Sequence, residues 1–346
     1  MTELDDPSKS PLNIGIVGLG SMGALHAAIA RALPGVALSA AIDSDERLLK
    51  LLSRVLPEIS VFTEIDEIGT LDRLDAIYIC TPPNTHHELA IRAQRAVPGI
   101  AVFVEKPMVT RSRDGADLAR RSIESKAVTM VGLQKRYVGT FKRAKEILDG
   151  GGIGNPVYFR SQTFTAGVLE TGSGWKFEPG TGGVLLDWGV HLVDLLYWFF
   201  GSMRVREAVR RRIFSANVED YVHATLQSDS GVTGSFEAGW SMRTHRSTEL
   251  TLEIHGTRGA LRVNEDQLTT YLDSPYEEFP AHPYSRHVHA LTPRIPYLLG
   301  QPENVLQEIA FLDSVRLRRP PPTSFANVAP IHLLMDSISE FPLERP

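Results

Sequence analysis

The chain has 346 residues, which is enough for two domains of roughly 150 residues each, and it carries 36 Lys and Arg against 41 Asp and Glu. Hydrophobic residues make up 42% and charged residues 22%, so the chain can bury a sizeable core and is neither disordered nor collagen-like. Asp187, His191 and Asp194 interrupt the most apolar stretch, which argues against a membrane span. The net charge of −5 and the absence of a long basic run argue against nucleic acid as the main partner.

The N-terminal residues and the single cysteine bear on where the protein resides. Residues 1–10 are acidic and have no apolar run behind a basic start, so they predict a flexible terminus of a cytoplasmic protein rather than a secretory signal. Cys80 has no second cysteine to pair with, which excludes an internal disulfide and a cysteine-based zinc site. The histidines at 282, 287 and 289 lack close ligand spacing, so we expect no metal.

In the first half of the chain, short apolar runs alternate with helical patterns. Unbroken apolar runs are typical of strands buried on both faces, and their alternation with helices predicts β-α-β units and a parallel sheet. The predicted strands cover residues 12–17, 37–42, 76–80, 100–104 and 128–133. This half is therefore expected to bind a nucleotide.

The pattern changes after a glycine-rich junction at residues 149–156, which ends a helix predicted over 140–148. From Tyr158 onward, apolar and polar residues alternate with period two, which predicts a mostly antiparallel sheet with one covered face. Hairpin turns are predicted at residues 229–231 and 256–259. Closing helices are predicted over residues 303–317 and 327–340.

The sharpest local signal is the glycine motif Gly18-Leu19-Gly20-Ser21-Met22-Gly23, which follows a predicted strand and opens a helix. Gly18 permits a tight turn, Gly20 lets the backbone approach a pyrophosphate, and Gly23 allows close packing of helix and strand. Asp43 ends the next strand, 20 residues after Gly23, where it can accept hydrogen bonds from ribose hydroxyls. Its charge would repel a 2′-phosphate, so NAD is favoured over NADP; the alternative is a purely structural glycine turn.

The second signal is Glu105-Lys106-Pro107, directly after the strand predicted over residues 100–104. Ligands of open α/β sheets bind at this carboxyl edge. Lys106 can act there as an acid, a base or a hydrogen-bond donor to a reacting oxygen. The alternative is a solvated surface lysine.

The third signal lies in residues 182–194. On a helix, Asp187, His191 and Asp194 are spaced i, i+4 and i+7, so they form one polar stripe on an otherwise apolar element. The functional interpretation is a general acid/base His191 with Asp187 beside it, both facing the cleft between the domains. The alternative is a structural Asp-His pair in the core. The loop carrying Trp175, Lys176 and Phe177 is either a mobile substrate wall or a packed turn.

These motifs, in this order, resemble the Gfo/Idh/MocA family, which includes glucose-fructose oxidoreductase and inositol dehydrogenase. The resemblance runs from Leu12 to the C-terminus and includes the segments 81–86, 132–137 and 254–259. It implies an α/β protein with an N-terminal Rossmann domain over residues 11–137. It also implies a second α/β domain over residues 138–346, with a large, mostly antiparallel open sheet for substrate binding and oligomerisation and a C-terminal helix that packs back on the first domain.

The resemblance also implies the chemistry. Lys106, Asp187 and His191 match the catalytic trio of the family, in which a sugar, cyclitol or derivative passes a hydride to nicotinamide. We expect His191 to take the hydroxyl proton, Asp187 to orient it or grip a neighbouring hydroxyl, and Lys106 to stabilise the oxygen. A homodimer or homotetramer is expected. The alternative enzyme is a redox-neutral glycosidase or epimerase that uses tightly bound NAD transiently; outside enzymes, it is a nucleotide-dependent sensor.

The predicted binding residues follow from the same matches. The cofactor is expected to contact Gly18, Gly20, Ser21, Met22, Gly23, Asp43, Thr81, Pro82, Asn84, His86, Glu105 and Lys106. The substrate is expected to contact Gln134, Arg136, Trp175, Asp187 and His191.

Overall fold

The structure is a computed structural model that describes residues 10–165, 174–240, 242–245, 247–295, 297 and 299–345. The chain divides into two compact units. The first comprises the described residues of Met1–Leu133 and Ile295–Pro330, and the second those of Gln134–Arg294 and Ile331–Pro346. Of the terminus expected to be flexible, all but Ser10 lies outside the described residues.

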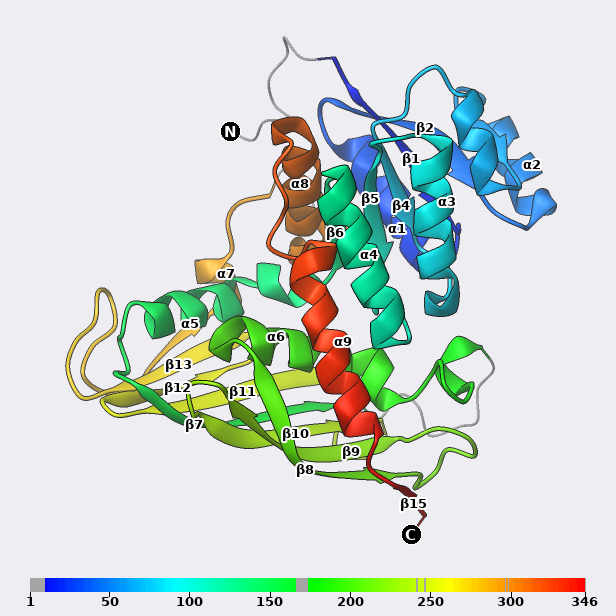
Figure 1. The fold of residues 1–346 in the computed structure, drawn as a ribbon. Helices are drawn as coiled ribbons and strands as arrows, with labels where there is room; N and C mark the ends of the chain where they lie inside the picture. Colours follow the sequence, from blue (N-terminus) through cyan, green and yellow to red (C-terminus); the bar gives the residue numbers. More distant parts are fainter. Residues whose placement is uncertain are drawn as a thin grey trace. The chain divides into compact units, whose positions relative to one another are not determined.

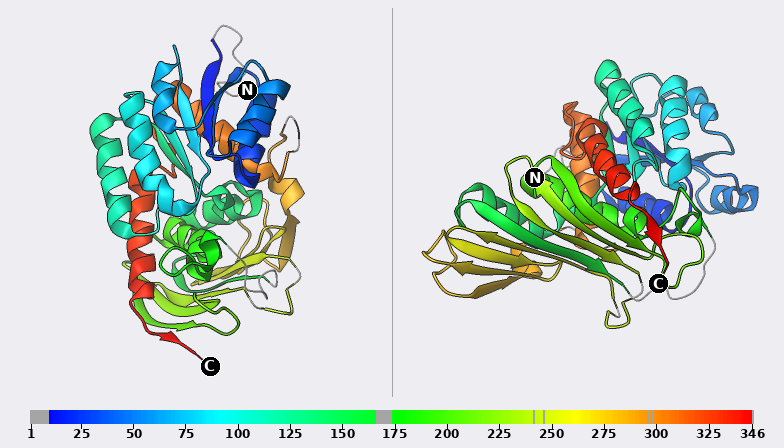
Figure 2. Two further views of the ribbon diagram at one scale, coloured as in Figure 1. Left: turned by 90° about the vertical axis from the view of Figure 1, so that its right-hand side faces the viewer. Right: turned by 60° about the horizontal axis from the view of Figure 1, so that its bottom comes forward.

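The first unit is built on a parallel six-stranded sheet with the order β3-β2-β1-β4-β5-β6. Its strands are β1 (Leu12–Val17), β2 (Val36–Ile42), β3 (Ser60–Phe62), β4 (Ala76–Ile79), β5 (Ala101–Glu105) and β6 (Thr129–Gly132). Helices α3 and α4 cover one face of the sheet, and α1 and α8 lie on the other (Figures 1 and 2). These helices are α1 (Ser21–Ala32), α3 (His86–Ala96), α4 (Ser112–Ser125) and α8 (Pro302–Leu317); α2 (Glu46–Val55) precedes β3.

The predicted parallel sheet is confirmed, apart from one strand that the pattern does not reveal. β3 is only three residues long and half-buried, so it lacks the unbroken apolar run by which the other strands were predicted. The core strands are far more buried; in β4 and β5, for example, every residue is buried.

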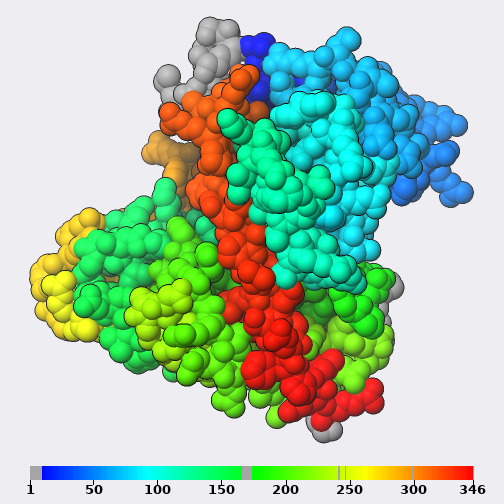
Figure 3. Space-filling model, in the orientation of Figure 1, coloured from blue at the N-terminus to red at the C-terminus, as the bar shows by residue number. Residues whose placement is uncertain are grey.

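The first unit also includes a late segment of the chain. The predicted domain limits put residues 295–330 in the second domain, whereas the structure groups them with the first unit. The reason is packing: α8 lies against α1, and the Val131 N–H of β6 donates to the Thr323 carbonyl at 2.9 Å. The outer side of α8, orange in Figure 3, is at the surface of this unit. The second boundary falls inside α9 (Phe325–Ser339).

The second unit contains a nine-stranded sheet with the order β14-β13-β12-β11-β7-β10-β9-β8-β15. Its strands are β7 (Pro156–Phe164), β8 (Met203–Arg211), β9 (Tyr221–Ser228), β10 (Thr233–Gly239), β11 (Glu249–Gly256), β12 (Gly259–Val263), β13 (Gln267–Leu272), β14 (Tyr284–His287) and β15 (Leu343–Glu344). Neighbouring strands are antiparallel except in the pairs β7–β10 and β8–β15. The predicted fold class, an α/β protein with a mostly antiparallel second sheet, is confirmed.

One face of this sheet is covered by helices α5 (Gly139–Asp149) and α6 (Val190–Phe200), as Figures 1 and 2 show. A short helix, α7 (Val288–Leu291), contacts α5. The alternating residues of β9 explain the layering, because Val222, Ala224 and Leu226 are fully buried while the residues between them are half-exposed.

Among the described helices, none has both the length and the apolar character needed to span a bilayer.

Candidate functional site

The glycine motif forms the turn between β1 and α1. Gly18 has a φ of +84°, and a Cβ there would lie 2.9 Å from Thr81 Cγ2. A Cβ on Gly23 would lie 1.8 Å from the Gly18 carbonyl oxygen, so only glycine fits beneath the turn. At Gly20, by contrast, a Cβ would meet no heavy atom within 4 Å. The fold itself therefore leaves Gly20 open to space, which is what close approach of a pyrophosphate to the backbone requires.

Asp43 follows β2 and is held against this turn. Its Oδ2 accepts the Leu19 N–H at 2.7 Å, and its Oδ1 accepts the Asp45 N–H at 2.9 Å. Asp45 in turn caps α2 by accepting the N–H groups of Arg47 and Leu48. The carboxylate of Asp43 is thus fixed beside the glycine turn by backbone groups.

A cavity of about 340 Å³ lies at this edge of the sheet. Five of the predicted cofactor residues line it: Gly18, Gly20, Asp43, Thr81 and Pro82. Its wall also includes residues outside the predicted cofactor set, among them Thr63, Glu64, Ile65 and Leu89. The first three directly follow β3. Because the sequence pattern did not predict this strand, it did not place these residues at the end of a strand. The open Gly20 backbone and the neighbouring carboxylate fit a dinucleotide here.

A larger cavity, about 600 Å³, lies elsewhere in the first unit and contains none of the predicted cofactor residues. The start of β1, the end of α4 and the end of α8 contribute to its lining. Ligands of open α/β sheets bind at the opposite, carboxyl edge, so the smaller cavity is the candidate cofactor site.

The turn after β4 is tied to the residue that follows Lys106. His86 is fully buried, and its Nε2 lies 2.8 Å from the Thr81 carbonyl oxygen while its Nδ1 lies 3.0 Å from the Pro107 carbonyl oxygen. Burial lowers the pKa of His86 below its ordinary value. His86 therefore links two backbone segments of the predicted cofactor site, and a direct contact with the cofactor stays a prediction.

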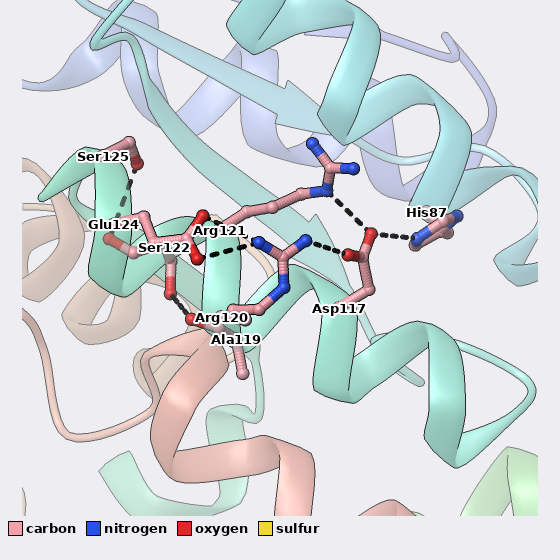
Figure 4. Close-up of polar contacts among 8 residues, drawn as sticks. All are labelled: His87, Asp117, Ala119, Arg120, Arg121, Ser122, Glu124 and Ser125. Carbon is pink, nitrogen blue, oxygen red and sulfur yellow. Dashed lines mark hydrogen bonds and ion pairs between the residues drawn. The ribbon is translucent and has the colours of Figure 1, made fainter.

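His87, the next residue, faces a different set of partners. Its Nε2 lies 3.0 Å from Asp117 Oδ2 on α4, and Asp117 also accepts from Arg120 and Arg121 (Figure 4). These ion pairs hold the pKa of Asp117 well below its ordinary value. The group is a helix-helix contact at the surface, which accounts for His87 without any ligand.

Lys106 directly follows β5. Its backbone N–H donates to Glu105 Oε2 at 3.0 Å, and Glu105 is itself buried, with 7% of its surface exposed. Beneath this carboxylate, a Cβ on Gly132 would lie only 3.0 Å from Glu105 Oε1. The start of the Glu105-Lys106-Pro107 segment is thus held by packing against β6 and by its own hydrogen bond.

In the second unit, Asp187 and His191 lie where two kinds of helix meet. Asp187 is in a π-helical turn over Leu185–Gly189, and His191 is near the start of α6; each side chain is about 1% exposed. The regular i, i+4 geometry expected from the sequence is therefore interrupted. Gly183, with a φ of +105°, packs against Glu219 just before this turn. π-helical turns of this kind occur frequently at functional sites.

Asp194, the third residue of the predicted polar stripe, is paired with Arg136. Asp194 forms a two-pronged ion pair with Arg136, with Nη2–Oδ1 at 2.6 Å and Nε–Oδ2 at 2.9 Å. The Arg136 guanidinium also lies 5.7 Å from the Trp198 ring. The side chain of Arg136 is only 9% exposed, so its donors are largely used within the unit. Its predicted contact with substrate stays a prediction.

Lys176 is a residue near Asp187 whose role the sequence left open. Its Nζ lies 3.0 Å from Asp187 Oδ2 and 5.9 Å from the centre of the Trp175 ring. The sequence predicts either a mobile substrate wall or a packed turn in the loop from 167 to 183, but residues 166–173 lie outside the described part. Trp175, predicted to contact substrate, begins the same turn.

The remaining predicted site residues are divided between the two units. Ser21, Met22 and Asn84 are in the first unit with the glycine turn, and Gln134 begins a short turn of the second unit. Within the described residues, no group of three or more His, Cys, Asp or Glu side chains could hold a metal ion.

Two family models match the chain. The model described as the oxidoreductase family with an NAD-binding Rossmann fold matches residues 12–133, and the model of the GFO/IDH/MocA C-terminal domain matches residues 141–262. Together they cover most of both units.

Similar proteins of known name include inositol dehydrogenases. The chain is 26% identical to scyllo-inositol 2-dehydrogenase (NAD(+)) of Bacillus subtilis, over 72% of each chain. It is 25% identical to myo-inositol 2-dehydrogenase of Thermotoga maritima, over 75% of this chain and 77% of that one. Levoglucosan dehydrogenase in complex with NADH and levoglucosan has the same fold, with a TM-score of 0.85 at 22% identity over 96% of both chains.

Proposed function

Because the chain belongs to the GFO/IDH/MocA family of NAD-binding oxidoreductases, we propose that it transfers a hydride between NAD and a hydroxyl or keto carbon of a sugar, a cyclitol or a sugar derivative. The observation that carries the proposal is the cavity beside the open Gly20 backbone and the Asp43 carboxylate. The inositol dehydrogenases among its relatives support a polyhydroxylated substrate.

The preference for NAD over NADP rests on Asp43. Its carboxylate is held at the end of β2 by two backbone N–H groups, where it can accept hydrogen bonds from ribose hydroxyls. A 2′-phosphate in that place would be repelled by the same charge, and the next residues, Ser44, Asp45 and Glu46, offer no cation. When bound, NAD supplies a hydride acceptor at the nicotinamide ring.

We assign three residues to the reacting hydroxyl. His191 takes the hydroxyl proton as the carbinol hydrogen leaves as hydride, and Lys106 stabilises the negative charge that grows on the oxygen. Asp187 orients His191 or binds a neighbouring hydroxyl of the substrate. In the reverse direction, His191 returns the proton to the oxygen of the reduced carbon. The burial of Asp187 and His191 supports these roles, because charges act more strongly away from water.

The test is NADH formation from NAD by the purified protein across a panel of inositols, sugars and anhydrosugars, followed by the Lys106→Met and His191→Asn variants. We expect each variant to lose about 10² to 10⁴-fold in kcat while NAD binding, followed by fluorescence, is retained. Lys126→Met and His223→Gln are matched controls on exposed or half-exposed side chains. Turnover that survives both site variants would overturn the assignment.

The same assay separates a net dehydrogenase from a redox-neutral enzyme. Accumulating NADH with a free polyol supports the proposed reaction. Tightly bound cofactor, consumption of the substrate and no net NADH would instead point to a glycosidase or epimerase.

A further inference from the structure

A chain of three buried titratable side chains reaches the backbone of Lys106 in the first unit, and the proposed reaction does not use it. His26 lies on α1, Glu105 ends β5, and Glu308 lies on α8. The exposed fractions of the three residues are 1%, 7% and 0%. Burying three ionisable groups has a large desolvation free energy unless the groups pair well. A function for the cluster would explain why it is present.

The side chains are joined end to end. His26 Nε2 lies 2.8 Å from Glu105 Oε1, and His26 Nδ1 is hydrogen-bonded to Glu308 Oε1. The other oxygen of Glu105, Oε2, accepts the backbone N–H of Lys106 at 3.0 Å. The connection therefore runs from Glu308 through His26 and Glu105 to the peptide group of Lys106.

The charges fit this order. A neutral imidazole has one N–H and can donate to only one carboxylate, whereas the imidazolium donates to both. Burial acts to lower the pKa of His26, but the carboxylates of Glu308 and Glu105 outweigh it and raise the pKa to about 10. Burial likewise acts to raise the pKa of Glu105, yet His26 brings it below its ordinary value. The charged ring can then donate to both carboxylates.

The surroundings keep the cluster dry. The rings of Phe103 and Tyr78 have centroids 5.0 Å and 5.5 Å from that of His26, and both rings are fully buried. Two titratable groups close to the cluster, Tyr78 and Cys80, have pKa values raised far above the ordinary range by burial and by the nearby carboxylates. They stay neutral, so the imidazolium of His26 is the cation that faces Glu105 and Glu308 from α1.

We propose that His26 and Glu308 are positioning residues for Lys106. They hold the Glu105 carboxylate in place, and that carboxylate holds the peptide N–H of Lys106. The inference rests on the proposed function, in which Lys106 faces the reacting oxygen. A displacement of the ammonium by about 1 Å from that place can cost about 10²-fold in rate. A cluster that serves stability alone would leave Lys106 unaffected when it is altered.

The experiment follows Lys106 directly. The chain has eight lysines, so ¹³C-methyl labelling gives few NMR signals, and Lys106→Arg identifies the one from Lys106. The variants are His26→Gln, which removes the positive charge and the two opposed ring nitrogens, and Glu308→Gln, which keeps the shape of the side chain. His332→Gln is the matched control, because His332 is an equally buried histidine of the second unit.

We expect both test variants to shift the Lys106 signal and to lower kcat by about 10²-fold, with KM for NAD unchanged, while His332→Gln changes neither. A folded His26→Gln or Glu308→Gln protein with the wild-type Lys106 signal would overturn the inference. If His26→Gln does not fold, Glu308→Gln decides. Failure of the proposed function shows separately, because turnover would then survive Lys106→Met whatever the NMR signal does.

Discussion

Lys176 donates a hydrogen bond to Asp187, with 3.0 Å between Nζ and Oδ2. The carboxylate is 1% exposed whereas the lysine side chain is 43% exposed, so a cation from a glycine-rich loop reaches a buried acid. Asp187 is one of the residues that we assign to the reacting hydroxyl. The loop thus supplies a positive charge beside the proposed catalytic pair.

Replacing Lys176 tests how much its hydrogen bond to Asp187 contributes to turnover. A hydrogen bond between charged groups contributes about 1.5–3 kcal/mol, so we expect Lys176→Met to lower kcat/KM about tenfold or more with NAD binding unchanged. Lys142→Met, on an exposed lysine of the same unit, is the control. Steady-state kinetics with the substrate found in the panel checks this, and equal kinetics in both variants would show that Lys176 does not support Asp187.

The Arg136–Asp194 pair makes a prediction about stability. Removing one partner leaves a buried charge uncompensated, so we expect Asp194→Asn to lower the free energy of unfolding by about 3–5 kcal/mol. The double variant Arg136→Met/Asp194→Leu should recover most of this loss. Urea unfolding measures both, and Glu124→Gln, which breaks an exposed pair on α4, should cost less than about 1 kcal/mol.

The same double variant also tests whether Arg136 contacts substrate. If it does, the variant is folded but its KM for the polyol rises. Unchanged KM and kcat in a folded double variant would remove Arg136 from the substrate-binding residues.

Asp43 should decide between the two dinucleotides. We expect Asp43→Asn, which keeps the size of the side chain but removes its charge, to weaken NAD binding about tenfold and to strengthen NADP binding. Asp45→Asn, two residues along the chain and exposed, controls for loss of charge alone. Titrations of both cofactors into the three proteins provide the measurement. Tighter binding of NADP than NAD by the unaltered protein would contradict the prediction.

His332 on α9 makes the second unit sensitive to acid. Burial is the main reason that its pKa falls to about 4, while Asp336 acts in the opposite direction. Because the folded pKa lies below the ordinary value of 6.5, the unfolded chain binds the proton first. The stability that depends on a neutral His332 is therefore present above pH 6.5 and is lost as the pH falls toward 4.

We accordingly expect the unaltered protein to lose about 2 kcal/mol more than His332→Gln between about pH 7 and pH 5. Denaturant unfolding at the two pH values gives the comparison. Parallel losses in the two proteins would mean that His332 is solvated or protonated in the folded state.

Much of the candidate cofactor site could be proposed from the sequence because it is built from neighbours along the chain. The glycine turn joins one strand to the next helix, Asp43 ends the following strand, and Lys106 follows β5 directly. Strand periodicity and the rule that ligands bind at the carboxyl edge are local, so the spacing of a few residues predicted these positions. β3 escaped because three half-buried residues carry no such pattern.

The sequence by itself therefore determined the fold class, the glycine turn and the candidate residues at strand ends, since period and turn chemistry are properties of adjacent residues. Only the tertiary structure decided which charges meet. Glu308 reaches His26 because α8 returns to α1 late in the chain, and Arg136 meets Asp194 across 58 positions. Glu219 likewise packs against Gly183, just before the π-helical turn that contains Asp187. Such pairings depend on how helices pack on sheets, which brings together residues that no local spacing relates.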